Sequence, residues 1–195
     1  EANMTLIGPT VLQGEQGVIN GSLTGNSNDL TLNFATETAI AGDGNGINDL
    51  TVVGPALLGA SVTTIGSQEY QSPVTLSDAT VLTGTNGTFT GSLNGNENDL
   101  TLDFEDVTTI DGSSTFSNLG NLVIKGDVVL NSTITTTGSQ TYEKNVSLSG
   151  ATILGGQNGT FGGPIAGNNN DLTLNFSDTT TITGSQLQDI HNLIV

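Results

Sequence analysis

Apolar and polar residues alternate in short stretches along the whole chain, with Leu-Thr-Leu at 30–32 as a clear example. Successive side chains on a β-strand point to opposite faces, so this alternation indicates strands with one buried and one wet face. Such stretches begin at Met4, Leu30, Leu50, Val74, Leu100, Leu122, Val146, Leu172 and Leu193, at intervals of 20 to 26 residues by subtraction. The pattern predicts short strands joined by turns, with no helix between them.

The residue before most of these starts is Asn or Asp. Of the eight positions, one is Pro73. The other seven are Asn or Asp: Asp29, Asp49, Asp99, Asn121, Asn145, Asp171 and Asn192. Their short side chains bond to nearby backbone and tolerate left-handed conformations, which is typical of a corner. A corner followed by a strand, repeated without helices, predicts a coil that buries its apolar face by stacking on its neighbours.

A longer repeat overlies the coils. The phrase Asn-Asp-Leu-Thr-Leu-Asn-Phe at 28–34 returns at 170–176, and with one Asp for Asn at 98–104, so its leucines are 70 and 72 residues apart. We therefore predict an all-β parallel β-helix (β-solenoid) of about eight coils of 20–26 residues, in a three-coil superrepeat of 70–72 residues. We expect one continuous solenoid over 1–195, with units at 4–73, 74–145 and an incomplete 146–195, forming a rod on the order of 40 Å long.

Aligned repeats share several glycine columns, which we interpret as turn positions that need positive φ or a close backbone approach. The columns hold Gly14, Gly84 and Gly156, then Gly17, Gly87 and Gly159, then Gly21, Gly91 and Gly163. Length changes near 41–46, 111–118 and 183–189 predict a variable corner loop, where a solenoid usually has its specificity. Tyr70 and Tyr142 occupy one column of the aligned repeats. We expect each of them either to fill a corner, with its hydroxyl bonded to a turn carbonyl, or to form a platform on which a sugar stacks.

Charge excludes some partners. The formal net charge is −17, with 19 acidic residues, no Arg and only Lys125 and Lys144 as cations. A nucleic-acid interface needs cations against phosphate, so we expect no nucleic-acid partner, and an anionic membrane surface would repel the chain. An acidic coat keeps a rod soluble. The chain has no Cys and no apolar run of transmembrane length, and the mid-strand ending at Val195 suggests a segment of a longer repetitive chain.

Candidate chemistry is sparse. His191, the only histidine, falls in a column of corner asparagines, so we expect an exposed turn position without function. A carbohydrate-active β-helix enzyme would need paired acids or cations. The densest acids, Asp103, Glu105 and Asp106, and the two lysines align with neutral residues in at least one sister repeat. We expect no enzyme and assign no catalytic, cofactor-binding or metal-binding residue.

Calcium binding is a stronger chemical hypothesis for this chain than catalysis. Stacked carboxylates at Asp29 and Asp49 would repel each other unless a cation or an amide lies between them. The stretch 42–46, Gly-Asp-Gly-Asn-Gly, is only faintly similar to calcium-binding β-rolls.

Ice binding would require two parallel files of Thr side chains. The coil starts provide one, Thr5, Thr31, Thr51, Thr75, Thr101 and Thr173, and no second file accompanies it.

Several motifs of the chain resemble the shaft repeats of filamentous haemagglutinin-like exoproteins. They are the coil starts, Gly-Ser-Gln-x-Tyr at 66–70 and 138–142, Thr-Gly-Thr-Asn-Gly-Thr-Phe at 83–89, and Gly-Asn-x-Asn-Asp-Leu-Thr-Leu at 25–32. These are very large secreted adhesins of Gram-negative bacteria, including cyanobacteria. The resemblance extends over nearly all 195 residues and lies in the general character of the sequence and in the spacing of its repeats. It implies a right-handed parallel β-helix, two-partner export and a role as fibre, stalk or adhesin.

Sequence and resemblance together predict a non-catalytic structural or adhesive segment of a secreted or cell-surface fibre. Three alternatives stay open: a glycan- or protein-binding adhesion module acting through corner loops, a carbohydrate-active enzyme, and calcium binding. Expected partners are other copies of the chain, end to end or side by side, and surface glycans or proteins. We expect no membrane insertion.

Overall fold

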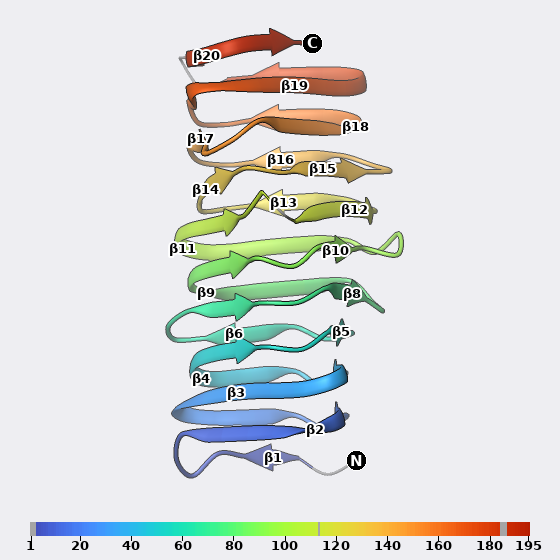
Figure 1. Cartoon of the computed structure of the whole chain (residues 1–195), viewed down its shortest axis with the longest axis vertical. Helices are drawn as coiled ribbons and strands as arrows, with labels where there is room; N and C mark the ends of the chain where they lie inside the picture. Colours follow the sequence, from blue (N-terminus) through green and yellow to red (C-terminus); the bar gives the residue numbers. More distant parts are fainter. Residues whose placement is uncertain (1–2, 113, 184–186) are drawn as a thin grey trace.

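The computed structural model describes residues 3–112, 114–183 and 187–195. Its described residues contain strands and no helix, and all the strands belong to one sheet network with parallel pairing throughout. The chain winds as a parallel β-solenoid of about nine turns, stacked from the N-terminus to the C-terminus (Figure 1). At about 4.8 Å per turn the rod is on the order of 43 Å long. The predicted fold class is confirmed.

The strands vary in length because the longer ones continue around corners. Their bounds are β1 (Met4–Thr5), β2 (Thr10–Ile19), β3 (Leu23–Ile40), β4 (Gly44–Val52), β5 (Ala56–Leu58), β6 (Val62–Thr64), β7 (Gln68–Tyr70), β8 (Val74–Leu76), β9 (Thr80–Phe89), β10 (Leu93–Asn94), β11 (Leu100–Ile110), β12 (Thr115–Leu119), β13 (Leu122–Ile124), β14 (Asp127–Leu130), β15 (Thr133–Thr136), β16 (Gln140–Tyr142), β17 (Val146–Leu148), β18 (Thr152–Phe161), β19 (Ile165–Ile182) and β20 (Leu187–Ile194).

Strand pairing divides each coil into three sides, here named A, B and C. Each side is a ladder of paired residues that continues from coil to coil. On side A the ladder is Thr10, Leu30, Leu50, Gln68, Gly87, Thr108, Val128, Val146, Ile165 and Leu187. On side B it is Gly17, Thr38, Ala56, Val74, Leu93, Phe116, Ile134, Leu154 and Leu174. On side C it is Met4, Leu23, Gly44, Val62, Leu82, Leu102, Ile124, Tyr142, Phe161 and Ile182.

These ladders correct the predicted coil length. Successive residues of the side A ladder are 18 to 22 positions apart by subtraction, so the predicted range of 20–26 was too long. Leu30 and Leu50 are vertical neighbours as expected, but the next residue above Leu50 is Gln68. Val74 pairs with Ala56 and Leu93 on side B. The predicted strand starts are real strands, but they do not lie in one file.

The superrepeat is correspondingly longer than three coils. Leu30 lies on side A, Leu100 on side C beside Thr80 and Leu122, and Leu172 on side B beside Thr152. From one copy of the phrase to the next the chain completes three coils and two further sides. The three copies therefore occupy the three different sides, each rotated by two sides relative to the copy before it. The prediction of a superrepeat made of three whole coils was wrong.

The interior is a continuous apolar column in which aromatic rings stack along the axis. Tyr70 lies on Phe89 with ring centroids 5.0 Å apart and planes 6° apart, and Tyr142 lies on Phe161 at 5.0 Å and 1°. The leucines of the three phrases are at most 2% exposed: Leu30, Leu32, Leu100, Leu102, Leu172 and Leu174. Each coil buries its apolar residues against the coils above and below it, as a solenoid requires.

The shared glycines are not all turn residues. Gly17, Gly87 and Gly159 lie on β2, β9 and β18, under the rings of the phrase phenylalanines; a Cβ at Gly87 would lie 2.2 Å from Phe104 Cε2. Gly91 and Gly163 do lie at corners, where a Cβ would meet the backbone of the coil before at 2.2 and 2.5 Å. The close approach is confirmed at these two corners and at Gly84 and Gly156, where a Cβ would lie 2.7 Å from the carbonyl oxygens of Gly66 and Gly138. Positive φ is found at only one described glycine, Gly46.

Asparagine supplies the left-handed corners instead. Before each copy of the phrase two consecutive residues have positive φ: Asn26 and Ser27, Asn96 and Glu97, and Asn168 and Asn169. The next residue, Asn28, donates its side-chain amide to the carbonyl oxygens of Gly25 and Asn26 at 3.0 and 3.1 Å. Short polar side chains tolerate this conformation because they hydrogen-bond locally.

Candidate functional site

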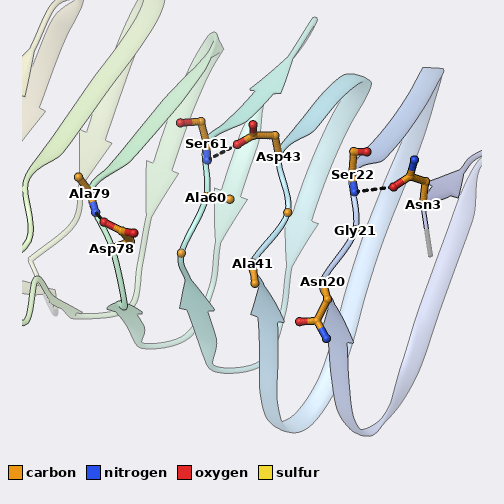
Figure 2. A pocket seen from close by; sticks show the side chains of 12 residues that line it. Asn3, Asn20, Gly21, Ser22, Ala41, Asp43, Ala60, Ser61, Asp78 and Ala79 are labelled. Carbon is orange, nitrogen blue, oxygen red and sulfur yellow. Dashed lines mark hydrogen bonds between the residues drawn. The ribbon is translucent and has the colours of Figure 1, made fainter. Parts of the chain in front are cut away.

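A groove runs along one corner at the N-terminal end of the rod, where the strands of side B end and those of side C begin on successive coils. We call it the corner groove; it has a volume of about 590 Å³ and is lined by Asn3 and by segments 20–22, 41–43, 59–61 and 78–79. Figure 2 shows these segments on successive coils, with the groove crossing them along the rod. The variable corner predicted at 41–46 falls on this groove at 41–43, whereas residues 44–46 belong to β4.

One residue of the groove, Gly59, has no side chain where the second superrepeat has one, and a Cβ at this position would lie 2.5 Å from Ser77 Oγ. Gly59 aligns with Asn131 of the second superrepeat, with an offset of 72 residues. At that sister corner the Asn131 amide fills the space between two glycines: a Cβ at Gly112 would lie 2.1 Å from its Nδ2, and one at Gly150 would lie 1.8 Å from its Oδ1. The position aligned with Gly150 is Asp78. The pair Gly59 and Asp78 thus opens the corner that Asn131 and Gly150 close.

Several polar atoms of the groove are free to bind a ligand. Asp43 Oδ1 accepts from the Ser61 N–H at 3.1 Å, and Asp78 Oδ1 accepts from the Ala79 N–H at 2.7 Å. The second carboxylate oxygen of each has no hydrogen-bond partner within the described residues, and the same holds for the Asn20 amide and the Ser61 hydroxyl. The floor is formed by small residues such as the buried Gly21 and Ala60. Sequence reasoning missed Gly59 and Asp78, although their mismatch with the sister repeat was visible.

Corner carboxylates and amides have a structural task throughout the rod. In each case a side-chain oxygen accepts a hydrogen bond from a backbone N–H one coil further on. The pairs are Asn3 with Ser22, Asp29 with Asp49, Asp43 with Ser61, Asp49 with Ser67, Asp99 with Asn121, Asn121 with Ser139, and Asp127 with Asn145, at 2.7 to 3.3 Å. Backbone donors at the corners are satisfied in this way, which explains the preference for Asn and Asp.

An amide separates the two stacked carboxylates for which calcium was considered. Asn48 Nδ2 donates to Asp29 Oδ1 at 2.7 Å and to Asp49 Oδ2 at 3.2 Å. Asp29 Oδ1 also accepts from the Asp49 N–H at 3.3 Å. Within the described residues no group of three or more His, Asp or Glu side chains is placed to hold a metal ion. At this corner an amide lies between the carboxylates, which is one of the two arrangements that the sequence left open.

The tyrosine column is part of the core. Tyr70 and Tyr142 are 1% exposed, which contradicts a sugar-stacking platform. Their hydroxyls donate to Gln68 Oε1 at 2.9 Å and to Gln140 Oε1 at 2.8 Å, so the partner is a glutamine side chain and not the predicted turn carbonyl. Gln68 Nε2 in turn donates to the Val62 and Thr83 carbonyl oxygens. Burial raises the pKa of both tyrosines well above the ordinary value.

His191 lies at an exposed corner, as predicted. Its Nδ1 is 2.8 Å from Asp171 Oδ1, a partner that the sequence did not signal. The hydrogen bond with His191, followed by one from Asn192, lowers the pKa of Asp171. This arrangement copies the corner of Asp29, Asn48 and Asp49, with the histidine in the place of Asn48. The geometry accounts for His191 as a corner residue.

The lysine and acid candidates lie on the outer surface. Lys125 Nζ is 2.8 Å from Asp103 Oδ2, and this hydrogen bond raises the pKa of Lys125, with a further contribution from the charge of Glu143. Glu105 and Asp106 are exposed, at a bulge of β11 opposite β9. The structure thus pairs one acid of the predicted cluster with a lysine and leaves the other two pointing to solvent.

The proposed threonine file is divided among the sides. Thr31 and Thr51 are neighbours on side A, Thr75 lies on side B, and Thr101 lies on side C. The observed outward file on side C is Val81, Thr101, Val123, Thr141, Thr160 and Thr181. The positions two residues further on include Asp103, Lys125 and Glu143. A flat surface with two Thr files is therefore not formed there.

The other two variable corners differ from the first. Residues 111–112 and Ser114 form a turn between β11 and β12, in which Ser114 N–H donates to the Asp111 carbonyl at 2.8 Å, and residues 115–118 belong to β12. In the third, residues 184–186 lie outside the described residues, and 187–189 belong to β20. The differences in repeat length do fall at corners, but the strands after these corners begin within the segments that were predicted to be loops.

Within the described ranges no helix is long and apolar enough to cross a membrane. Compared with models of protein families, with curated proteins and with solved structures, the chain matches none of them.

Proposed function

We propose that this chain is a non-catalytic structural segment of a secreted or cell-surface fibre, acting as a rigid spacer. The observation that supports this is where the repeated residues are used. The phrase leucines are buried, the shared glycines accommodate phenylalanine rings or neighbouring backbone, and the corner Asn and Asp side chains bond to the next coil. Residues that recur in every superrepeat thus serve stacking, as a spacer needs.

The surface charge supports the same role. The formal net charge is −17, and of the two lysines Lys125 is already paired with Asp103. Like-charged rods repel one another, so the acidic coat keeps neighbouring rods apart and in solution. Secretion or display at a cell surface is proposed from the resemblance to haemagglutinin-like shafts. Fractionation of the source cells with an antibody against the chain tests it, and confinement to the cytosol would contradict it.

Two measurements test the spacer. Spin labels at residues near opposite ends of the rod, placed on Gly8→Cys and His191→Cys, should give one narrow distance distribution that is unchanged by salt. A broad distribution would contradict a rigid rod. A reducing-sugar assay over a panel of polysaccharides should show no turnover, and release of new reducing ends would overturn the non-catalytic assignment.

An adhesive role is the second candidate, and one feature favours it. The corner groove is a concave, polar surface feature with unpaired oxygens and amides, in a fold where most repeated polar corner side chains are bonded to the next coil. Solenoids commonly bind partners along such extended surfaces. Adhesion through this corner is compatible with the spacer, since it uses the second carboxylate oxygen of Asp43, whose first oxygen keeps its bond to the next coil, and the side chains of Asn20 and Asp78.

A further inference from the structure

We propose that the corner groove binds a neutral linear oligosaccharide lying along the rod axis. The inference deepens the adhesive part of the proposed function and rests on it. Five successive passes of the chain line the groove, at Asn3, 20–22, 41–43, 59–61 and 78–79, and they follow one another at about 4.8 Å. The sugar units of an extended glycan advance by a similar length, so each coil faces about one unit.

The polar groups in the groove suit hydroxyl groups. Asp43 and Asp78 each have one carboxylate oxygen bonded to a backbone N–H, which orients the group, and one oxygen free. A free carboxylate oxygen accepts from a sugar hydroxyl, and the Asn20 amide and the Ser61 hydroxyl both donate and accept. In Figure 2 the acids and Asn20 lie along the same corner on different coils. Such a set binds a chain of hydroxyls better than a single small ion.

Charge narrows the ligand class. Asp43 and Asp78 lie two coils apart, about 10 Å at one strand spacing per coil, so they do not converge on one cation. No lysine lies in the groove and the chain has no arginine, which disfavours sulfated or uronic acid glycans. A cationic peptide would find only these two separated carboxylates. A neutral glycan requires no countercharge, and the small floor residues Gly21 and Ala60 allow a sugar ring to approach the backbone.

The sister corner shows that the opening depends on particular residues. There Asn131 fills the corresponding space and Gly150 makes room for it. The same coil type can therefore be closed, and at the two aligned positions the groove has Gly59 and Asp78 instead. This provides a variant for the test: Gly59→Asn with Asp78→Gly transplants the closed corner.

Titration calorimetry with cellohexaose, maltohexaose and chitohexaose tests the proposal, with a heparin hexasaccharide and an oligolysine peptide as charged probes. We expect at least one neutral hexaose to bind the native chain and the folded Gly59→Asn/Asp78→Gly variant to bind it at least about tenfold more weakly. If that variant does not fold, Asp78→Ala decides, since it removes the free carboxylate oxygen that the proposal places against a sugar hydroxyl and should weaken hexaose binding in the same way.

Three results would overturn the proposal: no neutral hexaose binds, only the heparin or oligolysine probe binds, or the closed variant binds as tightly as the native chain. None of these bears on the spacer, which the spin-label distances test separately.

Discussion

Gly87 lies directly beneath the ring of Phe104, so that a Cβ on the glycine would be 2.2 Å from Cε2 and 2.6 Å from Cδ2 of the phenylalanine. The same contact recurs between Gly17 and Phe34 and between Gly159 and Phe176. The phenylalanine ends the repeated phrase and the glycine precedes it by 17 residues in each copy by subtraction, so the superrepeat encodes a steric fit between successive coils.

Replacing Gly87 by Ala should therefore destabilise the rod. The added methyl group overlaps a buried ring that has no free space, which typically costs about 1–3 kcal/mol of the free energy of unfolding. Urea unfolding measures this change. Gly8→Ala is the control, because a Cβ added there would have nothing within 4 Å, and it should be neutral within about 0.5 kcal/mol. Equal stability of the two variants would contradict the contact.

The buried tyrosines predict a loss of stability in alkali. Burial raises the pKa of Tyr70 and Tyr142 in the folded chain above the ordinary value of 10.0. Their protonated form is thus favoured by folding: its contribution is complete below the unfolded pKa, and it declines as pH rises through that value, by about 1.4 kcal/mol per pH unit for each tyrosine. Urea unfolding at a series of pH values, from pH 8 to about one unit above the ordinary tyrosine pKa, measures how steeply the free energy of unfolding falls with pH.

The double variant Tyr70→Phe/Tyr142→Phe should remove this alkaline slope. Below the ordinary pKa it should be less stable than the native chain by about 1–3 kcal/mol for each site, because Gln68 Oε1 and Gln140 Oε1 lose their donors in a buried place. A variant that keeps the native alkaline slope would show that the tyrosines are not the titrating groups.

Calcium should not be required for the corner of Asp29 and Asp49. The Asn48 amide already bridges the two carboxylates, so chelator or added millimolar calcium should leave the melting temperature unchanged. Asn48→Ala should lower the free energy of unfolding by about 1 kcal/mol, with a larger effect at low salt. Asn45→Ala, an exposed change without a hydrogen bond to lose within the described residues, is the control. A stabilising calcium shift in the native chain would contradict this account.

Alternation and corner residues were sufficient to predict the stacked parallel strands, because both reflect local chemistry. The coil register was not accessible in the same way. On side A the apolar ladder continues through Gln68, Gly87 and Thr108, which are not apolar, so a search for apolar starts passes from Leu50 to Val74 on another side. Gln68 is buried because its amide bonds are satisfied inside, and this depends on coils that only the fold brings together.

The corner groove shows the same limit. A glycine and an aspartate at 59 and 78 resemble ordinary turn residues in the sequence, and the space between them becomes visible only when the coils are stacked. What the sequence did contain was the difference from the sister repeat, Asn131 and Gly150. Comparison between repeats locates such exceptions once the register is known.

Disulfide trapping tests the register most directly, since the native chain has no cysteine. Thr51 and Glu69 are paired neighbours on side A, whereas Thr75 lies on side B, paired with Leu57 and Asn94. Neighbouring strands are about 4.8 Å apart, within the Cα separation that a disulfide spans. The account predicts that Thr51→Cys/Glu69→Cys forms a disulfide on mild oxidation and that Thr51→Cys/Thr75→Cys keeps two free thiols. The opposite result, a disulfide only in the second variant, would contradict the side A register, in which successive residues are 18 to 22 positions apart.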